Sequence, residues 1–299
     1  IRSIWDTKGI KKLRYSMKVS DRKTKREEQL RVELLIATMN RKDDSILEQM
    51  RVQSDAVVIN QGSPFQWREF RQNAHLVRFL CCEELGVGLS RNTALMRARG
   101  DICLFADDDL VYRDGYAEML GRAFRDFPDA DVLVFNIQSI GARKNRYQIQ
   151  RPMRVHWYNF ERYGAARIAV RRTSIFQHHI SFSLLFGGGA QYSCGEDTLF
   201  LRDCLKAGLK IYAVPFTLAD VDDSSSSWFH GYDEKFLRDR GALYRAMYPR
   251  LTLLWCFIYL LRHRRVWQEN GSFTGSLRSM KRGARDYTAH GGEYVKEES

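Results

Sequence analysis

The sequence predicts an α/β fold in which a doubly wound, mostly parallel sheet is flanked by helices and followed by a helical C-terminal segment. Two observations lead to this fold class. Short, continuous apolar runs recur along the chain, for example at residues 34–37 and 56–59, as they do in strands that are buried on both faces. Segments with helical patterns separate these runs, and such alternation of strands and helices is typical of parallel sheets.

The first half of the chain supplies four of the expected strands. They are predicted at residues 33–38, 55–60 and 74–80 and directly before Asp107, with helices at residues 45–50 and from residue 89 onward. Ser90 is the predicted N-cap of the second helix, and Gly100 is expected to close it.

The second half continues the alternation around one irregular insertion. Helices are expected at residues 113–127, 197–207 and 234–247, and strands at 131–136, 168–170 and 211–216. Residues 138–165 are polar and aromatic with little periodicity, so we expect an irregular insertion that covers a binding site.

The basic charge of the chain lies mainly at its two ends. Of the formal net charge of +12, residues 1–32 contribute 11 Lys or Arg against 4 Asp or Glu, and residues 262–299 contribute 8 against 5. A nucleic-acid cleft would place its basic residues on the folded core, so no nucleic-acid partner is expected. The six Cys show no metal-ligand spacing, which favours a reducing, cytoplasmic compartment.

Three adjacent carboxylates, Asp107, Asp108 and Asp109, end the fourth expected strand. Ligands of open α/β sheets bind outside the carboxyl ends of strands, where this triplet would lie. Adjacent carboxylates repel one another, and a hard cation such as Mg²⁺ or Mn²⁺, shared with phosphate oxygens, would hold them together. The alternative for the triplet alone is a solvated acidic turn.

Several blocks occur in a fixed order along the chain: Thr38-Met39-Asn40-Arg41, Ser90-Arg91-Asn92, the Asp triplet, a glycine-rich turn at 187–189, and Gly195-Glu196-Asp197. In this combination residues 33–240 resemble a family 2 glycosyltransferase with the GT-A fold, of the type that builds bacterial surface polysaccharides. The resemblance implies an inverting, metal-dependent enzyme that moves a sugar from a nucleotide-sugar donor, with a UDP-sugar expected, to a hydroxyl of a saccharide or lipid-linked saccharide acceptor.

The resemblance also assigns roles by position. Thr38, Asn40, Arg41 and Arg91 would bind the donor together with Asp107 and Asp108. Asp109, Asp107 and His230 would hold the divalent cation, Mn²⁺ or Mg²⁺. Asp197 would be the catalytic base, with Glu196 beside it.

The expected organisation is a basic N-terminal arm or helix at residues 1–32, a GT-A domain at 33–245 and a helical tail at 246–299. Within that tail, residues 251–261 are apolar and precede the basic cluster 262–265. A run of 11 residues is too short to cross a bilayer, so the segment is either a buried terminal helix or a dock on an anionic membrane surface. The second alternative would place the enzyme peripherally on the inner face of the cell membrane.

Two other functions compete with glycosyl transfer at this point. A metal-dependent nucleotidyltransferase would share the nucleotide site and the carboxylates but would not need Asp197. A non-catalytic protein could bind anionic surfaces through its basic ends.

Overall fold

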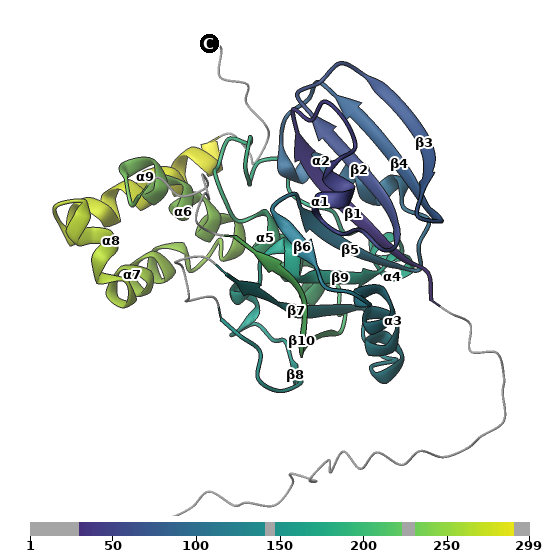
Figure 1. Ribbon diagram of the computed structural model, residues 1–299. Helices are drawn as coiled ribbons and strands as arrows, with labels where there is room; N and C mark the ends of the chain where they lie inside the picture. The colour runs from purple at the N-terminus through teal and green to yellow at the C-terminus, as the bar shows by residue number, and fades with distance from the viewer. Residues whose placement is uncertain (1–29, 141–146, 223–230, 290–299) are drawn as a thin grey trace, which may run out of the picture.

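The computed structural model describes residues 30–140, 147–222 and 231–289. Within these ranges ten strands form one sheet in the order β3-β4-β2-β1-β5-β9-β7-β10-β6, with β8 paired to β10. Six of the strands point the same way, so the mixed sheet is mostly parallel, and helices flank it on both sides (Figure 1). The predicted fold class is confirmed.

The parallel half of the sheet follows the predicted strands closely. It contains β1 (Val32–Met39), β2 (Asp55–Gln61), β4 (His75–Cys82) and β5 (Ile102–Asp107). β1 lies between β2 and β5, with Leu34 beside both Ala56 and Leu104. The apolar runs of these strands are almost fully buried, as expected for central parallel strands.

The other half of the sheet is mixed. β7 (Val132–Ser139) and β10 (Ile211–Val221) are parallel, whereas β9 (Ile168–Arg171) runs antiparallel between β5 and β7. The expected strand at 168–170 is therefore present but reversed. β10 is longer than predicted and also pairs with two short antiparallel strands, β6 (Leu110–Tyr112) and β8 (Met153–Arg154), neither of which the sequence had indicated.

A further strand, β3 (Gln66–Gln72), was missed at the other edge of the sheet. It forms a hairpin with β4 through Asn73 and Ala74, whose φ angles of 48° and 70° suit a two-residue turn. The strand predicted at 74–80 is therefore β4 and the Asp triplet ends β5, one strand later in the chain order than expected.

Helices cover the two faces of the sheet, which divides the core into two layers. One cluster packs α1 (Ile46–Gln49) and α3 (Tyr116–Asp126) on the side that Leu34 and Ile36 face. The other packs α2 (Val87–Arg97) and α5 (Glu196–Lys206) on the side that Leu35 faces. A short helix, α4 (Arg172–Gln177), follows β9, and 3₁₀ turns η1 (Phe160–Arg162) and η2 (Ala165–Arg167) lie in and after the irregular insertion.

The prediction that Ser90 caps the second helix is wrong. α2 already begins at Val87 after Gly86, and the Ser90 backbone N–H donates to the Gly86 carbonyl oxygen over 2.9 Å. The earlier start is stabilised from outside the helix, because the Val87 N–H donates to the carbonyl oxygen of Gly188 over 2.9 Å. Gly100 lies beyond the last helical residue, and a Cβ there would meet the Cβ of Glu33 at 2.7 Å.

The C-terminal helices form a unit at one end of the molecule, away from β3 (Figure 1). They are α6 (Glu234–Met247), α7 (Thr252–Arg262), α8 (Arg264–Glu269) and α9 (Phe273–Ala289). α9 packs tightly on α6 because Gly241 and Gly283 leave room: a Cβ at either would collide with a backbone carbonyl of the opposite helix. The expected boundary at residue 245 falls inside α6, and the division into domains stays a prediction. No helix among the described residues is both long and apolar enough to cross a bilayer.

Candidate active site

The candidate site lies at the carboxyl edge of the parallel strands. β1 ends in Thr38 and Met39, and β5 ends in Asp107 beside it, with Ala37 in register with Asp107. Because parallel strands end at the same edge, polar residues that are far apart in sequence meet there.

Asp108 is held by two of the predicted donor-binding residues. Its Oδ2 accepts a hydrogen bond from Thr38 Oγ1 over 2.5 Å and lies 2.9 Å from Arg41 Nη2. Arg41 Nε also donates to Thr38 Oγ1 over 3.2 Å. The middle member of the Asp triplet thus organises the end of β1.

The backbone after β1 is fixed by β2. Asn40 has a φ of 54°, and its N–H donates to the Gln61 carbonyl oxygen over 2.9 Å, which leaves its own side chain at the surface. Asn60 accepts from the Arg41 N–H and donates to the Arg41 carbonyl oxygen, each over 2.9 Å. Asn60 was not among the predicted site residues, since a polar residue at the end of a strand carries no signal of such a contact.

Arg91 joins two parts of the site. Its Nη2 lies 2.6 Å from Asp107 Oδ1 and its Nη1 lies 2.7 Å from Glu196 Oε1, while its side chain is only 4% exposed. Burial alone would lower the pKa of Arg91, but Asp107 and Glu196 more than offset this, so the pKa is raised and the guanidinium stays charged. In the structure Arg91 contacts protein carboxylates, and its direct contact with a donor stays a prediction.

Asp197 lies beside this ion pair in a cavity of about 280 Å³ that is also lined by Arg91, Asp107 and Glu196. Burial, and then the negative charge of Glu196, raises the pKa of the Asp197 carboxyl to about 7. Hydrogen bonds from the Thr198 N–H and hydroxyl to Asp197 Oδ1, over 2.6 and 3.2 Å, oppose this rise. A carboxyl with such a pKa can accept and release a proton near neutral pH.

The helix start that carries these residues depends on glycine. α5 begins at Glu196 rather than at Asp197, and Gly195 before it has a φ of 115°. Glu196 Oε2 accepts from the Gly195 N–H over 3.2 Å. Gly187, with a φ of 108°, packs so closely that a Cβ would lie 3.0 Å from the Glu196 carboxyl carbon. The glycine-rich turn therefore positions Glu196 against Arg91.

The same cavity contains residues that the sequence did not single out: Tyr147, Arg162, Gly164, Ala165, Ala166 and Arg167. Arg162 lies over the ring of Tyr147, with its guanidinium carbon 5.1 Å from the ring centre. These residues come from the expected insertion and the turn after it, where no periodic pattern marks the side chains that face a site.

The carboxylates that could hold a metal ion are Asp107 and Asp109. The Asp109 side chain is exposed at the turn after β5, and that of Asp107 is 37% exposed. The described residues contain no group of three or more His, Cys, Asp or Glu that could hold an ion by themselves. The donor set fits Mg²⁺ or Mn²⁺ that takes one or two carboxylates and completes its shell with phosphate oxygens. His230, the third predicted ligand, lies outside the described residues.

Comparison with protein families identifies the domain around this site. The family described as "Glycosyl transferase family 2" matches residues 38–186, from the end of β1 to the turn before α5. The chain belongs to glycosyl transferase family 2. The match includes Thr38, Arg41, Arg91 and the Asp triplet, whereas Glu196 and Asp197 lie beyond it. No curated protein matches the chain in a search by sequence.

Solved structures agree with this family at the level of the fold. The chain is similar to Staphylococcus aureus TarS 1-349 in complex with UDP-GlcNAc, at 13% identity and a TM-score of 0.55, over 89% of this chain and 93% of that one. TarS 1-349 in complex with UDP gives 15% identity and a TM-score of 0.54 over the same shares of the two chains. This chain is therefore a glycosyltransferase of family 2 with a GT-A fold, and the family uses nucleotide sugars. The nucleotidyltransferase and the non-catalytic alternative are set aside.

Proposed function

We propose that this glycosyltransferase moves a sugar from a UDP-sugar, with inversion, to a hydroxyl of a saccharide or lipid-linked saccharide acceptor, and that Asp197 is the general base. The observation that carries the proposal is the Asp197 carboxyl, whose pKa is raised to about 7 within a cavity shared with Arg91, Asp107 and Glu196. UDP is proposed because the TarS structures similar to this chain contain UDP-GlcNAc and UDP.

In the proposed reaction, Asp197 takes the proton of the acceptor hydroxyl as its oxygen attacks the anomeric carbon of the donor. The bond from that carbon to the diphosphate oxygen breaks, and the electron pair leaves with UDP. A single displacement of this kind inverts the configuration at the anomeric carbon. Glu196 pairs with Arg91, and its negative charge raises the proton affinity of Asp197.

The end of β1 is proposed to hold the nucleotide. Thr38, Asn40 and Arg41 lie at that end, and Asp108 fixes two of them by hydrogen bonds. Asp107 and Asp109 are the proposed ligands of Mn²⁺ or Mg²⁺. A bound divalent ion would neutralise the charge that develops on the leaving diphosphate.

The choice of sugar and acceptor, and the place where the enzyme works, are also proposed. Specificity for the sugar and the acceptor is expected to come from the insertion, including Tyr147 and Arg162 of the cavity. We further propose that the enzyme works peripherally at the inner face of the cell membrane, where a lipid-linked acceptor would be available.

The experiment that tests the function identifies the reaction products and measures the dependence of the rate on the metal ion. A panel of UDP-sugars is incubated with the full chain, saccharide acceptors and Mn²⁺, with and without EDTA, and the nucleotide released is identified. We expect UDP, release that stops in EDTA and an inverted anomeric configuration in the product. Full release in EDTA would overturn the metal assignment, and a retained configuration would overturn the single displacement.

A further inference from the structure

The helix α7 presents an apolar face to solvent. Thr252, Cys256 and Leu260 are buried against the protein. On the opposite face Leu254, Phe257 and Leu261 are 51%, 42% and 56% exposed, at spacings that place them along one stripe of a helix. Soluble proteins rarely expose a continuous stripe of large apolar side chains, and such a stripe usually marks a site of interaction.

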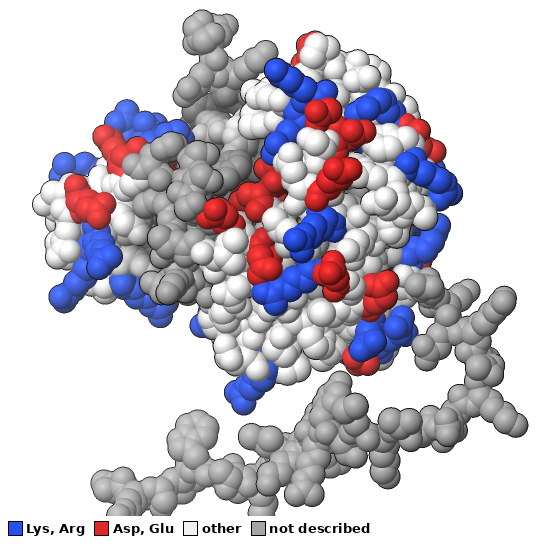
Figure 2. Space-filling model, in the orientation of Figure 1, with Lys and Arg blue, Asp and Glu red and all other residues white. Residues whose placement is uncertain are grey.

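The surroundings of this stripe are strongly basic. Residues 250–289 contain eight Lys or Arg and two acidic residues, Glu269 and Asp286. Asp286 is already paired with Arg238 over 2.7 Å. Arg262, Arg264 and Arg265 are all exposed at the junction of α7 and α8, and Figure 2 shows basic side chains gathered over this end of the molecule.

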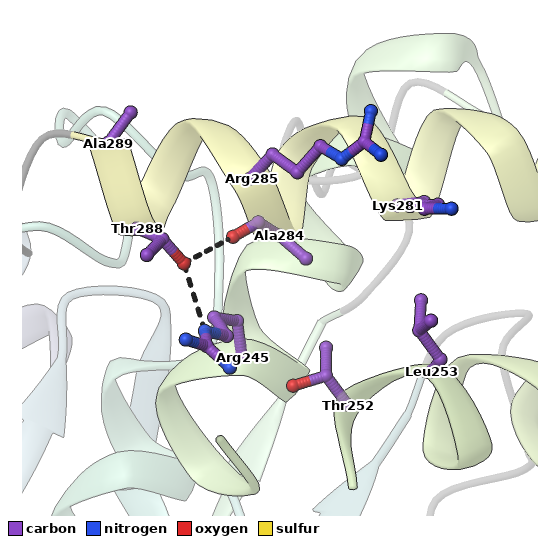
Figure 3. A pocket seen from close by; sticks show the side chains of 8 residues that line it. All are labelled: Arg245, Thr252, Leu253, Lys281, Ala284, Arg285, Thr288 and Ala289. Atoms are coloured by element: carbon purple, nitrogen blue, oxygen red, sulfur yellow. Dashed lines mark hydrogen bonds between the residues drawn. The ribbon is translucent and has the colours of Figure 1, made fainter. Parts of the chain in front are cut away.

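A groove between α7 and α9 adds a second feature to the same surface (Figure 3). It has a volume of about 460 Å³, and Thr252, Leu253 and Ala284 contribute to its lining. Lys281 and Arg285 of α9 stand at its edge and are exposed, with no ion pair to any acidic residue in the described part of the chain. A groove with an apolar lining and cations at its edge suits a phospholipid. The cations can contact the lipid phosphate, and the apolar lining can contact the first carbons of the chain.

We propose that the exposed face of α7, together with the groove beside α9, docks on the surface of an anionic lipid bilayer. The apolar stripe would enter the boundary between headgroups and acyl chains, as interfacial helices do, and the arginines at the end of α7 would meet lipid phosphates. This deepens the proposed function by naming the surface that faces the membrane, and it rests on that function only for the placement of the acceptor.

The charge of this surface favours an anionic bilayer over a second copy of the chain as its partner. A symmetric pair formed through α7 would bring the same basic residues of both copies together, and like charges across an interface oppose association. An anionic bilayer instead complements both the apolar stripe and the cations around it.

The test measures binding of the full chain to vesicles of phosphatidylcholine with and without phosphatidylglycerol. We expect binding to the anionic vesicles that weakens as salt is added. Replacing Arg262, Arg264 and Arg265 by Ser should weaken it roughly 100-fold, since each basic residue near such a surface contributes on the order of fivefold in affinity. The matched control replaces Arg71, Arg99 and Arg122, three exposed arginines on the GT-A fold, and should bind nearly as well as the wild type.

A second variant tests the apolar stripe separately, by replacing Leu254 and Phe257 with Ser. Leu254 and Phe257 are 51% and 42% exposed, so the loss of stability should be small and come mainly from the edge-to-face contact of Phe257 with Phe273. Vesicle binding should fall at least tenfold, in line with the apolar area lost. UDP affinity, measured on every variant, should not change, and it reports on the proposed function independently of docking. Equal vesicle binding by the basic variant and its control would overturn the proposal. So would a concentration-dependent dimer that the Leu254 and Phe257 changes abolish.

Discussion

Arg91 and Glu196, which are 105 residues apart in the sequence, form a buried ion pair in which Nη1 lies 2.7 Å from Oε1. The other end of the same guanidinium contacts Asp107. The pair therefore ties the start of α5, with Asp197 next in the chain, to the carboxyl end of β5.

Replacing Arg91 by Met should destabilise the fold strongly. The change keeps most of the side-chain volume but leaves Glu196 buried without a cation, and breaking a buried pair in this way costs about 3 kcal/mol or more. Urea unfolding measures the loss. Arg31→Met, which removes an exposed pair with Asp101, is the control and should cost less than about 1 kcal/mol. Equal losses of unfolding free energy in the two variants would mean that the buried pair stabilises the fold no more than the exposed pair does.

Substitution of Asp108 should weaken donor binding, whereas substitution of Asp109 should weaken metal binding. Asp108→Asn removes the charge that Thr38 and Arg41 contact, so UDP affinity should fall about tenfold while the Mn²⁺ concentration for half-maximal rate stays unchanged. Asp109→Asn should raise that Mn²⁺ concentration. Titrations of both variants with UDP and with Mn²⁺ provide the comparison. If Asp108→Asn shifts the Mn²⁺ requirement as much as Asp109→Asn does, Asp108 is itself a metal ligand.

Asp197→Asn should stabilise the protein at alkaline pH. The pKa of the folded carboxyl, about 7, lies above its ordinary value of 3.8, so the folded state holds this proton more tightly than the unfolded state. The contribution of Asp197 to stability is therefore greatest below 3.8 and is lost as the pH rises through about 7. Relative to the wild type, we expect the variant to gain on the order of 4 kcal/mol between about pH 4 and about pH 8. Unfolding free energies of both proteins across this range check it. A constant difference would mean that the carboxyl titrates normally.

Glu196→Gln should move the acid limb of the rate profile. The negative charge of Glu196 helps to raise the pKa of Asp197, so its removal lowers that pKa and keeps the base deprotonated at lower pH. The amide oxygen of Gln can still accept from Arg91. Initial rates of UDP release against pH give the profile, with Asp203→Asn, the same loss of charge elsewhere on α5, as the control. An acid limb that does not move, or that moves equally in the control, would remove Glu196 from the role of tuning the base.

The central strands and the ends that carry the site could be predicted from sequence because their signals are local. The buried runs of β1, β2 and β5 are continuous, and the polar residues Thr38, Arg41 and Asp107 follow from where these strands end. In a parallel sheet, the position of a strand end along the chain is enough to place its side chains at the ligand edge.

The elements that the sequence did not predict depend on tertiary contacts, which leave no local sequence pattern. β3 is an edge strand rich in polar residues, and its turn places Ala74 at a φ of 70°, where Gly or Asn would have indicated a hairpin. α2 begins before Ser90 because Gly188, from a distant part of the chain, accepts a hydrogen bond from Val87.

The same reason limits prediction of the site. The sequence marked Arg91 and Glu196 separately, through their motifs, but a contact across 105 residues has no local pattern. Residues 251–261 are apolar at almost every position, so only the packing of α7 distinguishes Cys256 and Leu260, which are buried, from Leu254 and Phe257, which are exposed.

The role of Asp197 as the base is tested most directly by the rate of UDP release by Asp197→Asn, measured beside its UDP affinity by calorimetry. The amide can still accept the Thr198 hydrogen bonds, so the fold and UDP affinity should persist. Without a proton acceptor, the rate should fall by about 10²–10⁴. UDP release at the wild-type rate, with unchanged UDP affinity, would contradict the assignment of Asp197 as the base.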